Sequence, residues 1–406
     1  MANLLIALIS LALVLSGVLY KGVDAAYLII VFIGIWFFLS EKIALSNDLK
    51  VFYTLALILL LAISIAVIRF DWHAFFSWRF SSLQLLLFIP FIATYLMRYR
   101  YSDQVVWRIL IVSALFAPVW IVMILWSWPV QRSTGLLFDA INRGNMGMLF
   151  GLVSLIALFA VNDWRWKLLA IIGFGGGVIL SVLSGSRGGW LALIISLCTL
   201  TFVFFKYAKK TEFRVLVFVQ LILLLGVILF WDYLPIQTRL MQVVNDIQLY
   251  ADGNIHTSVG YRFELWKVSY YAFLEKPLLG WGWTNFNAAH QYVMQAGLVE
   301  KTRLFGHPHN QFLLFLVETG LFGILALLAF LLWPLLVAIG YIRKSIEFNA
   351  HVYWAVLMIV VTEAIVEFSL TDDSFSQKYF VFVYLLLTLI VLQFLGDKAT
   401  QSSVSE

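Results

Sequence analysis

The sequence predicts an all-α protein that crosses a membrane many times. Of its 406 residues, 63% are apolar and only 12% are charged, a balance far from that of a soluble globular domain. The apolar residues gather in runs long enough to cross a bilayer as helices. The chain also has 16 Trp and 35 Phe, and aromatic residues are enriched at membrane interfaces. We therefore expect a polytopic protein surrounded by membrane lipids, with no nucleic-acid partner.

About twelve runs satisfy the length criterion for a transmembrane helix. The first lacks the positively charged start of a cleavable signal peptide and is interpreted as a span. Cys198 lies inside another run and is expected to be a small buried hydrophobic residue. The pattern predicts nine helices in residues 1–230, an extramembrane segment at 231–307 and three helices in 308–406. The runs are 3–20, 25–40, 50–68, 82–97, 106–126, 145–161, 168–184, 190–206, 212–230, 310–339, 351–368 and 379–395.

The distribution of cations predicts the orientation of the chain. If both termini are cytoplasmic, the cytoplasmic connections carry about twice as many Lys and Arg residues as the short connections on the other side, in agreement with the positive-inside rule. The segment 231–307 then lies outside the cytoplasm.

Two connections have a recognisable character. Residues 69–81 interleave aromatic residues with two arginines, which favours a segment lying among lipid headgroups. The segment 231–307 is too small for an independent enzyme domain. Its pattern predicts a short helix over 236–249, a break at 252–254, and a second amphipathic helix from near Gly260 to Pro277.

Arg187 is the sharpest candidate for function among the charged residues. It lies between two predicted spans, beside Ser186 and three glycines. Glycines let backbone N–H groups approach an anion, and a guanidinium can bind phosphate oxygens through two hydrogen bonds. The alternative is a turn whose arginine reaches the lipid headgroups. Arg262 poses the same choice, because it could instead be a solvated charge paired with Glu264 or Glu275.

Other polar residues leave two interpretations open. Arg143 and Asn145 belong to a polar turn before a span, which needs no ligand. Glu318, Glu363 and Glu367 lie within predicted spans, where a charge is costly unless it is paired. They are either structural partners of buried arginines or, for Glu363 and Glu367, the titrating pair of a proton-coupled transporter.

His309 is the candidate general base. It lies at the start of the run 310–339, where the positive end of a helix dipole keeps an imidazole neutral, and a neutral imidazole can accept a proton. Asn310 beside it can cap the helix or hold an acceptor group. His307 and His309 do not suggest a metal site, because Glu318 would lie on the opposite side of the helix. The pair Asp372–Asp373 is interpreted as a polar turn.

Four motifs in one order resemble the O-antigen ligase family. They are Ser184-Gly-Ser-Arg187-Gly-Gly-Trp190, Tyr261-Arg262-Phe-Glu-Leu-Trp266, Pro277-Leu-Leu-Gly280-Trp-Gly282-Trp-Thr-Asn285-Phe286, and His307-Pro-His309-Asn310-Gln-Phe-Leu313 with Glu318-Thr-Gly320-Leu-Phe-Gly323. Together with the large loop before the tenth predicted span, they cover roughly residues 130–325.

The resemblance implies an inverting glycosyltransferase of the GT-C type that uses no metal or cofactor. Such a ligase works at the periplasmic face of the bacterial inner membrane and moves polysaccharide from undecaprenyl pyrophosphate to the lipid A-core. By motif, Arg187 and Arg262 would bind the pyrophosphate and His309 would deprotonate the acceptor. An O-antigen polymerase and a protein-glycosylating ligase are alternatives with the same donor. Further residues expected at the substrate are Arg143, Asn145, Ser186, Asn310 and His307.

Overall fold

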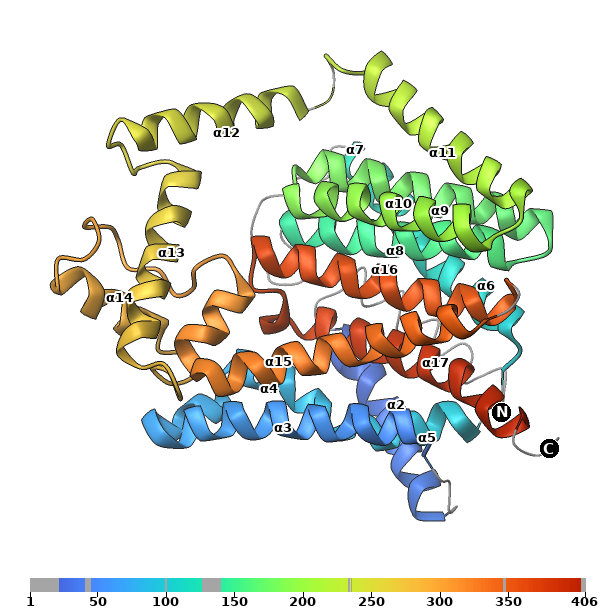
Figure 1. Cartoon of the computed structure of the whole chain (residues 1–406), viewed down its shortest axis with the longest axis horizontal. Coiled ribbons are helices and arrows are strands. Elements are labelled where there is room, and N and C mark those ends of the chain that lie inside the picture. Colours follow the sequence, from blue (N-terminus) through green and yellow to red (C-terminus); the bar gives the residue numbers. More distant parts are fainter. Residues whose placement is uncertain are drawn as a thin grey trace.

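The computed structural model describes residues 22–40, 45–98, 101–125, 140–232, 234, 236–345 and 348–402. Within these ranges the protein is built from helices and contains no strand, as the sequence predicts (Figure 1). The helices of the first half are α2 (Gly22–Ser40), α3 (Asn47–Phe70), η1 (Trp72–Phe76), α4 (Trp78–Leu83), η2 (Gln84–Phe88), α5 (Ile89–Arg98), α6 (Asp103–Ala114), α7 (Phe116–Leu125), α8 (Ala140–Ala160) and α9 (Trp164–Ser184). The second half contributes α10 (Arg187–Tyr207), α11 (Lys210–Leu229), α12 (Ile236–Ala251), α13 (Ser258–Glu275), α14 (Phe286–Gln295), α15 (Gln311–Lys344), α16 (Ala350–Thr371), η3 (Ser374–Ser376) and α17 (Lys378–Ser402).

Ten stretches of the described chain are long and apolar enough to cross a membrane, where the sequence predicted about twelve. The first predicted span, 3–20, lies outside the described residues, and the second corresponds to a shorter apolar helix at Leu28–Ser40. The fourth span begins at Arg79 rather than at residue 82. Arg79 belongs to the segment expected to lie among lipid headgroups, but its side chain is buried in the bundle.

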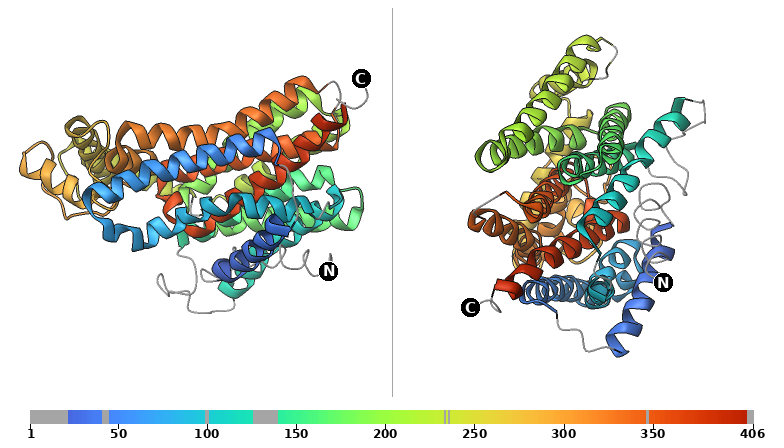
Figure 2. Two further views of the ribbon diagram at one scale, coloured as in Figure 1. Left: turned by 90° about the horizontal axis from the view of Figure 1, so that it is seen from below. Right: turned by 90° about the vertical axis from the view of Figure 1, so that its right-hand side faces the viewer.

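Helix α16 is the centre of the bundle. It lies between α8 and α10 on one side and α15 and α17 on the other (Figures 1 and 2), and most of its residues are buried. Trp354 of α16 stacks on Trp107 at 3.9 Å and on Phe394 at 4.4 Å between ring centroids. Helix α11, in contrast, lies at the edge of the bundle and buries only Leu216. Cys198 of α10 is exposed on the bundle surface, contrary to the burial expected from its apolar run.

Helices α12, α13 and α14 lie together at one end of the bundle (Figure 1). The two helices predicted for this segment are present, and Gly253 separates them with a left-handed φ of 88°. Thr257 caps α13 by accepting a hydrogen bond from the N–H of Gly260. Helix α12 buries none of its residues. Leu240, Val244 and Ile247 are exposed on one face of it, the pattern of a helix that rests in a membrane interface.

Helix α15 contains a break at Gly320, where φ is 65° and ψ is −161°. A non-helical residue interrupts the hydrogen bonds of a helix, and the freed groups need other partners. Residues 277–282 provide these partners through their own backbone. The hydrogen bonds run from the N–H groups of Trp281 and Gly282 to the carbonyls of Val317 and Glu318, and from those of Leu321 and Phe322 to the carbonyls of Pro277 and Leu278.

We expect Gly320→Ala to destabilise the protein by at least about 2 kcal/mol. An L-residue pays roughly 1–2 kcal/mol for the left-handed conformation, and the new Cβ would lie 2.4 Å from the carbonyl group of Leu278. Thermal unfolding of the purified protein in detergent measures the loss. Gly340→Ala in the same helix is the control, because nothing lies within 4 Å of its Cβ position. Equal melting temperatures for the two variants would contradict this account of the break.

Candidate functional site

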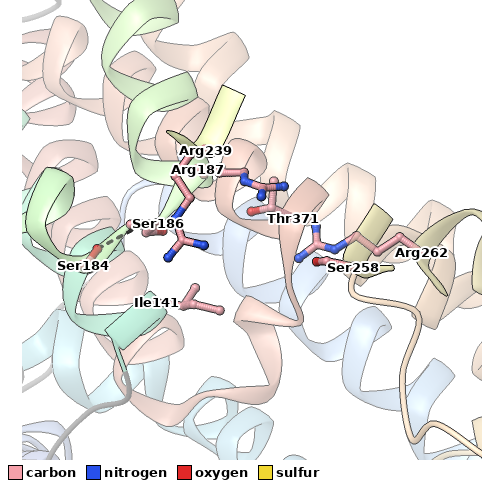
Figure 3. Close-up of a pocket in the computed structure, with 10 residues that line it drawn as sticks. Ile141, Ser184, Ser186, Arg187, Arg239, Ser258, Arg262 and Thr371 are labelled. Atoms are coloured by element: carbon pink, nitrogen blue, oxygen red, sulfur yellow. Dashed lines mark hydrogen bonds between the residues drawn. The ribbon is translucent and has the colours of Figure 1, made fainter. Parts of the chain in front are cut away.

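A cavity of about 410 Å³ opens where α8, α9, α10, α12, α13 and α16 meet. Three arginines line it, Arg187, Arg239 and Arg262, and Figure 3 shows their guanidinium groups converging on one space. We call this space the arginine cavity. Its other lining residues are Ile141, Ser184, Gly185, Ser186, Gly188, Ser258 and Thr371.

The turn between α9 and α10 places Arg187 at the mouth of the cavity. Gly185 ends α9 in the left-handed conformation, with φ of 69°, as glycine commonly does after the last turn of a helix. The hydroxyl of Ser186 then donates a hydrogen bond to Asn145 of α8. Arg187 is therefore the first residue of α10, where the helix dipole adds positive potential to that of the guanidinium.

Arg262 projects into the cavity from the first half of α13. It is not paired with Glu264, one of the two partners considered from the sequence. Glu264 instead accepts hydrogen bonds from Lys267 at 2.8 Å, Tyr250 at 2.7 Å and the N–H of Glu300. Burial lowers the pKa of Arg262, and the charge of Arg187 lowers it further, whereas Asp372 acts in the opposite direction. Arg262 thus lies within electrostatic reach of both the cavity and Asp372.

His309 lies just before α15 rather than within its first turn. Its φ is 52°, a left-handed conformation that costs energy in residues other than glycine and is often found at functional sites. Asn310 is the N-cap and accepts a hydrogen bond from the N–H of Leu313 at 3.0 Å. Of the two roles considered for Asn310, the structure shows the cap. Its amide also donates to the carbonyl of Leu370, which holds the start of α15 against the end of α16.

Asp372 faces His309, with 3.5 Å between Oδ1 of the carboxylate and Nδ1 of the imidazole. Asp372 and Asp373 do lie in the turn between α16 and η3, as expected, and the contact with His309 is an additional feature that the sequence did not predict. Burial raises the pKa of Asp372, but its contact with His309 and the nearby His307 lower it below its usual range. Burial and the charge of Asp372 raise the pKa of Asp373 to about 7. The negative charge of the pair thus resides on Asp372, beside the imidazole.

His307 is neutral at physiological pH. Burial, and then the neighbouring His309, lower its pKa to about 4. Its Nδ1 accepts a hydrogen bond from the backbone N–H of His309 at 3.3 Å. The centroids of the two imidazole rings lie 4.3 Å apart. His307 therefore supports the unusual backbone conformation of His309.

His307, His309 and Asp372 are of the types that bind metals, and their ligand atoms lie within 4.8 Å of one another. Glu318 was not expected to be a third ligand, because the sequence predicts it on the opposite side of the helix from His309. Asp372 fills that position by geometry. Arg79 and Arg262 act electrostatically on His307, however, and two positive charges oppose a divalent cation. They favour an anion near this cluster.

Glu318 forms a buried ion pair with Arg79, a partner that the sequence did not suggest. The two side chains make two hydrogen bonds of 2.9 and 2.7 Å. Arg79 also donates to the hydroxyl of Ser376 at 3.2 Å and stacks on Trp283 at 4.6 Å. The ion pair therefore connects α4, α15 and the loop that carries Asp372.

The remaining predicted residues lie around this site rather than in it. Arg143 is buried and stacks on Trp120 at 5.2 Å, and Asn145 is the partner of Ser186. Glu363 accepts a hydrogen bond from Thr199 at 2.7 Å. In the described part of the chain, neither Glu363 nor Glu367 pairs with an arginine, contrary to one expectation.

Comparison with known families shows where this site belongs. Residues 172–328 match the family model described as O-antigen ligase. These residues form an O-antigen ligase domain. The match confirms the resemblance inferred from the motifs. Arg187, Arg239, Arg262 and His309 all lie inside the domain, whereas Arg79 and Asp372 lie outside it.

A similar protein from Haemophilus influenzae is described only as uncharacterized. It is 28% identical over 200 residues, which make up 48% of this chain and 50% of the relative. The match thus spans about half the length of each protein. It extends the likeness to a bacterial protein without indicating which acceptor this chain would use.

We expect Arg79→Met or Glu318→Leu to destabilise the protein by about 3–5 kcal/mol, because each leaves a buried charge without its partner. The double variant Arg79→Met/Glu318→Leu removes both charges and should recover most of this loss. Denaturant or thermal unfolding of the four proteins, compared as a double-mutant cycle, tests the coupling. Additive losses would show that the ion pair is not a unit.

Proposed function

We propose that this protein is an O-antigen ligase. It would transfer polysaccharide from undecaprenyl pyrophosphate to the lipid A-core, at the periplasmic face of the bacterial inner membrane. The family match supports glycosyl transfer. The observation that carries the proposal is the position of the arginine cavity beside the His309–Asp372 pair. Thr371 lines the cavity, and the next residue faces the imidazole.

The cavity suits the diphosphate of a lipid-linked donor. Arginine binds phosphate oxygens with charge and directed hydrogen bonds. In the described residues, Arg187 and Arg262 have no carboxylate partner within ion-pair distance, so their donors are available to a ligand. The hydroxyls of Ser258 and Thr371 lie in the same wall. Arginines at the end of a transmembrane bundle can bind this group while the lipid tail stays in the membrane.

His309 would act as the general base. Its Nδ1 faces Asp372, so the carboxylate favours the tautomer with hydrogen on Nδ1 and leaves Nε2 free to accept a proton. An acceptor hydroxyl attacks the anomeric carbon of the donor and gives its proton to Nε2. The bond from that carbon to the phosphate oxygen breaks, and its electron pair remains on the diphosphate. Direct displacement inverts the anomeric centre, and the arginines stabilise the charge of the leaving group.

Two other functions predict different results. An O-antigen polymerase shares the donor and the domain but extends a second lipid-linked glycan instead of the lipid A-core. A proton-coupled transporter would depend on Glu363 and Glu367, two carboxylates within α16. A glycosyl transferase is favoured over a transporter because its expected groups converge at one end of the bundle, whereas Glu363 is bonded to Thr199.

The decisive test is transfer by the purified protein, reconstituted with lipid-linked O-antigen and lipid A-core in the presence of EDTA. We expect product to form, and His309→Ala to lower the rate by about 10²–10⁴, the usual contribution of a general base. Arg187→Ala should also lose activity. His256→Ala and the double variant Glu363→Gln/Glu367→Gln should retain it, because His256 is exposed outside the cavity. Wild-type rates in His309→Ala, or a requirement for metal, would refute the mechanism.

In the same assay, Asp372→Asn should lower the turnover by about tenfold to hundredfold, because a misplaced catalytic group costs rate in that range. The KM for the donor should change little, since Asp372 would position the base and not bind the diphosphate. Asp252→Asn, an exposed carboxylate of the α12–α13 break, is the matched control. A loss confined to KM would mean that Asp372 serves substrate binding instead.

A further inference from the structure

Arg239 is the third arginine of the cavity, and no motif in the sequence had drawn attention to it. It lies in α12, more than 50 residues after the turn that carries Arg187. In the described structure, its side chain donates one hydrogen bond, to the exposed Gln242 at 3.2 Å. It forms no ion pair with a described carboxylate. Most of its donor groups are therefore free to bind a ligand.

Gly185, in the turn from Ser184 to Arg187, has no side chain and leaves room for the guanidinium of Arg239. A Cβ on Gly185 would lie 3.1 Å from Nη2 and 3.3 Å from Nε of Arg239. The guanidinium thus packs against the backbone of the turn, beside Arg187. The two positive charges repel each other, and Asp246 is the carboxylate that offsets them at Arg187. One carboxylate for two adjacent guanidinium groups leaves an excess of positive charge in the cavity.

The docking of α12 explains how Arg239 reaches this place. Residues 239, 246 and 250 share one face of the helix by their spacing. Asp246 accepts a hydrogen bond from the N–H of Val259 at 3.3 Å, and Tyr250 donates to Glu264 at 2.7 Å. Both contacts fix α12 to the start of α13, which also carries Arg262. The face that docks on α13 is therefore the face that presents Arg239 to the cavity.

We propose that Arg239 is a third ligand of the donor's diphosphate, with its main role at the leaving group. This inference rests on the proposed function. In a glycosyl lipid diphosphate each phosphorus carries one ester bond and one anhydride bond, and the group has two negative charges. When the sugar leaves, the terminal phosphate keeps only its anhydride bond. Because the second pKa of such a terminal phosphate is about 6, as in a phosphomonoester, it gains most of a third charge at neutral pH. The positive charge of three arginines therefore matches the negative charge of the product better than that of the donor.

This charge balance predicts whether Arg239 acts mainly on kcat or on the KM of the donor. An interaction that strengthens as charge develops lowers the barrier of the reaction, whereas one equal in both states lowers only KM. Arg187 and Arg262 are sufficient to neutralise the two charges of the bound donor. Arg239 should consequently contribute to kcat and to the affinity for the lipid diphosphate product, and little to the KM of the donor.

The test uses the full-length protein in nanodiscs, with transfer kinetics and with undecaprenyl diphosphate and undecaprenyl monophosphate as inhibitors. Arg239→Gln should lower kcat by about tenfold to hundredfold, the range of one charge-assisted hydrogen bond, while KM changes little. It should weaken inhibition by the diphosphate to a similar extent and by the monophosphate much less. Arg239→Lys should be intermediate, because it keeps the charge and loses the fork of donors.

Lys301→Gln removes one exposed positive charge outside the cavity and should behave as the wild type in every measurement. Unchanged melting temperature in Arg239→Gln would show that the fold is intact, and Arg239→Lys provides a folded variant if it is not. Wild-type kcat and diphosphate inhibition in Arg239→Gln would overturn the inference while leaving the ligase proposal standing. Arg239-dependent binding of the diphosphate without any glycan transfer would support the inference and refute the proposed function.

Discussion

The buried ion pair between Arg79 and Glu318 is the interaction on which the arrangement of the site depends. Both side chains are withdrawn from solvent, so each charge requires the other. The pair joins the first turn of the Arg79–Arg98 span to α15, and Arg79 reaches Ser376 in the loop after Asp372. The backbone carbonyl of Glu318 also accepts a hydrogen bond from the N–H of Gly282. One residue therefore connects the helix bundle, the broken helix behind His309 and residues 277–282.

The site combines a strong excess of positive charge with a single well-placed carboxylate. Arg187, Arg239 and Arg262 surround a cavity without a compensating ion pair among the described residues. Such an arrangement raises the local concentration of anions and disfavours cations. Asp372 lies at the edge of this positive region, where Arg262 acts on it from one side and His309 from the other. This distribution of charge suits the diphosphate donor and the general base of the proposed function.

The site divides into residues that the sequence could indicate and residues that it could not. Arg187 and His309 stood out because each begins an apolar run beside glycine, serine or asparagine, where a polar residue is costly without a purpose. Arg239 and Asp372 gave no such signal, because one lies in an ordinary amphipathic helix and the other in a short turn. Arg79 was misassigned for a related reason: an arginine near aromatic residues reads as interfacial until its partner, 239 residues away, is known.

The sequence by itself determined the helical class, most of the spans and the order of the motifs, because apolar runs, caps and glycine turns act over a few residues along the chain. The tertiary structure decided which of these elements meet. Folding brings Asp372 to His309 and Arg239 to Gly185. It also supplies hydrogen bonds from residues 277–282 in place of those lost at Gly320. Contacts between residues far apart in sequence follow from how the helices pack, and local pattern carries no record of that packing.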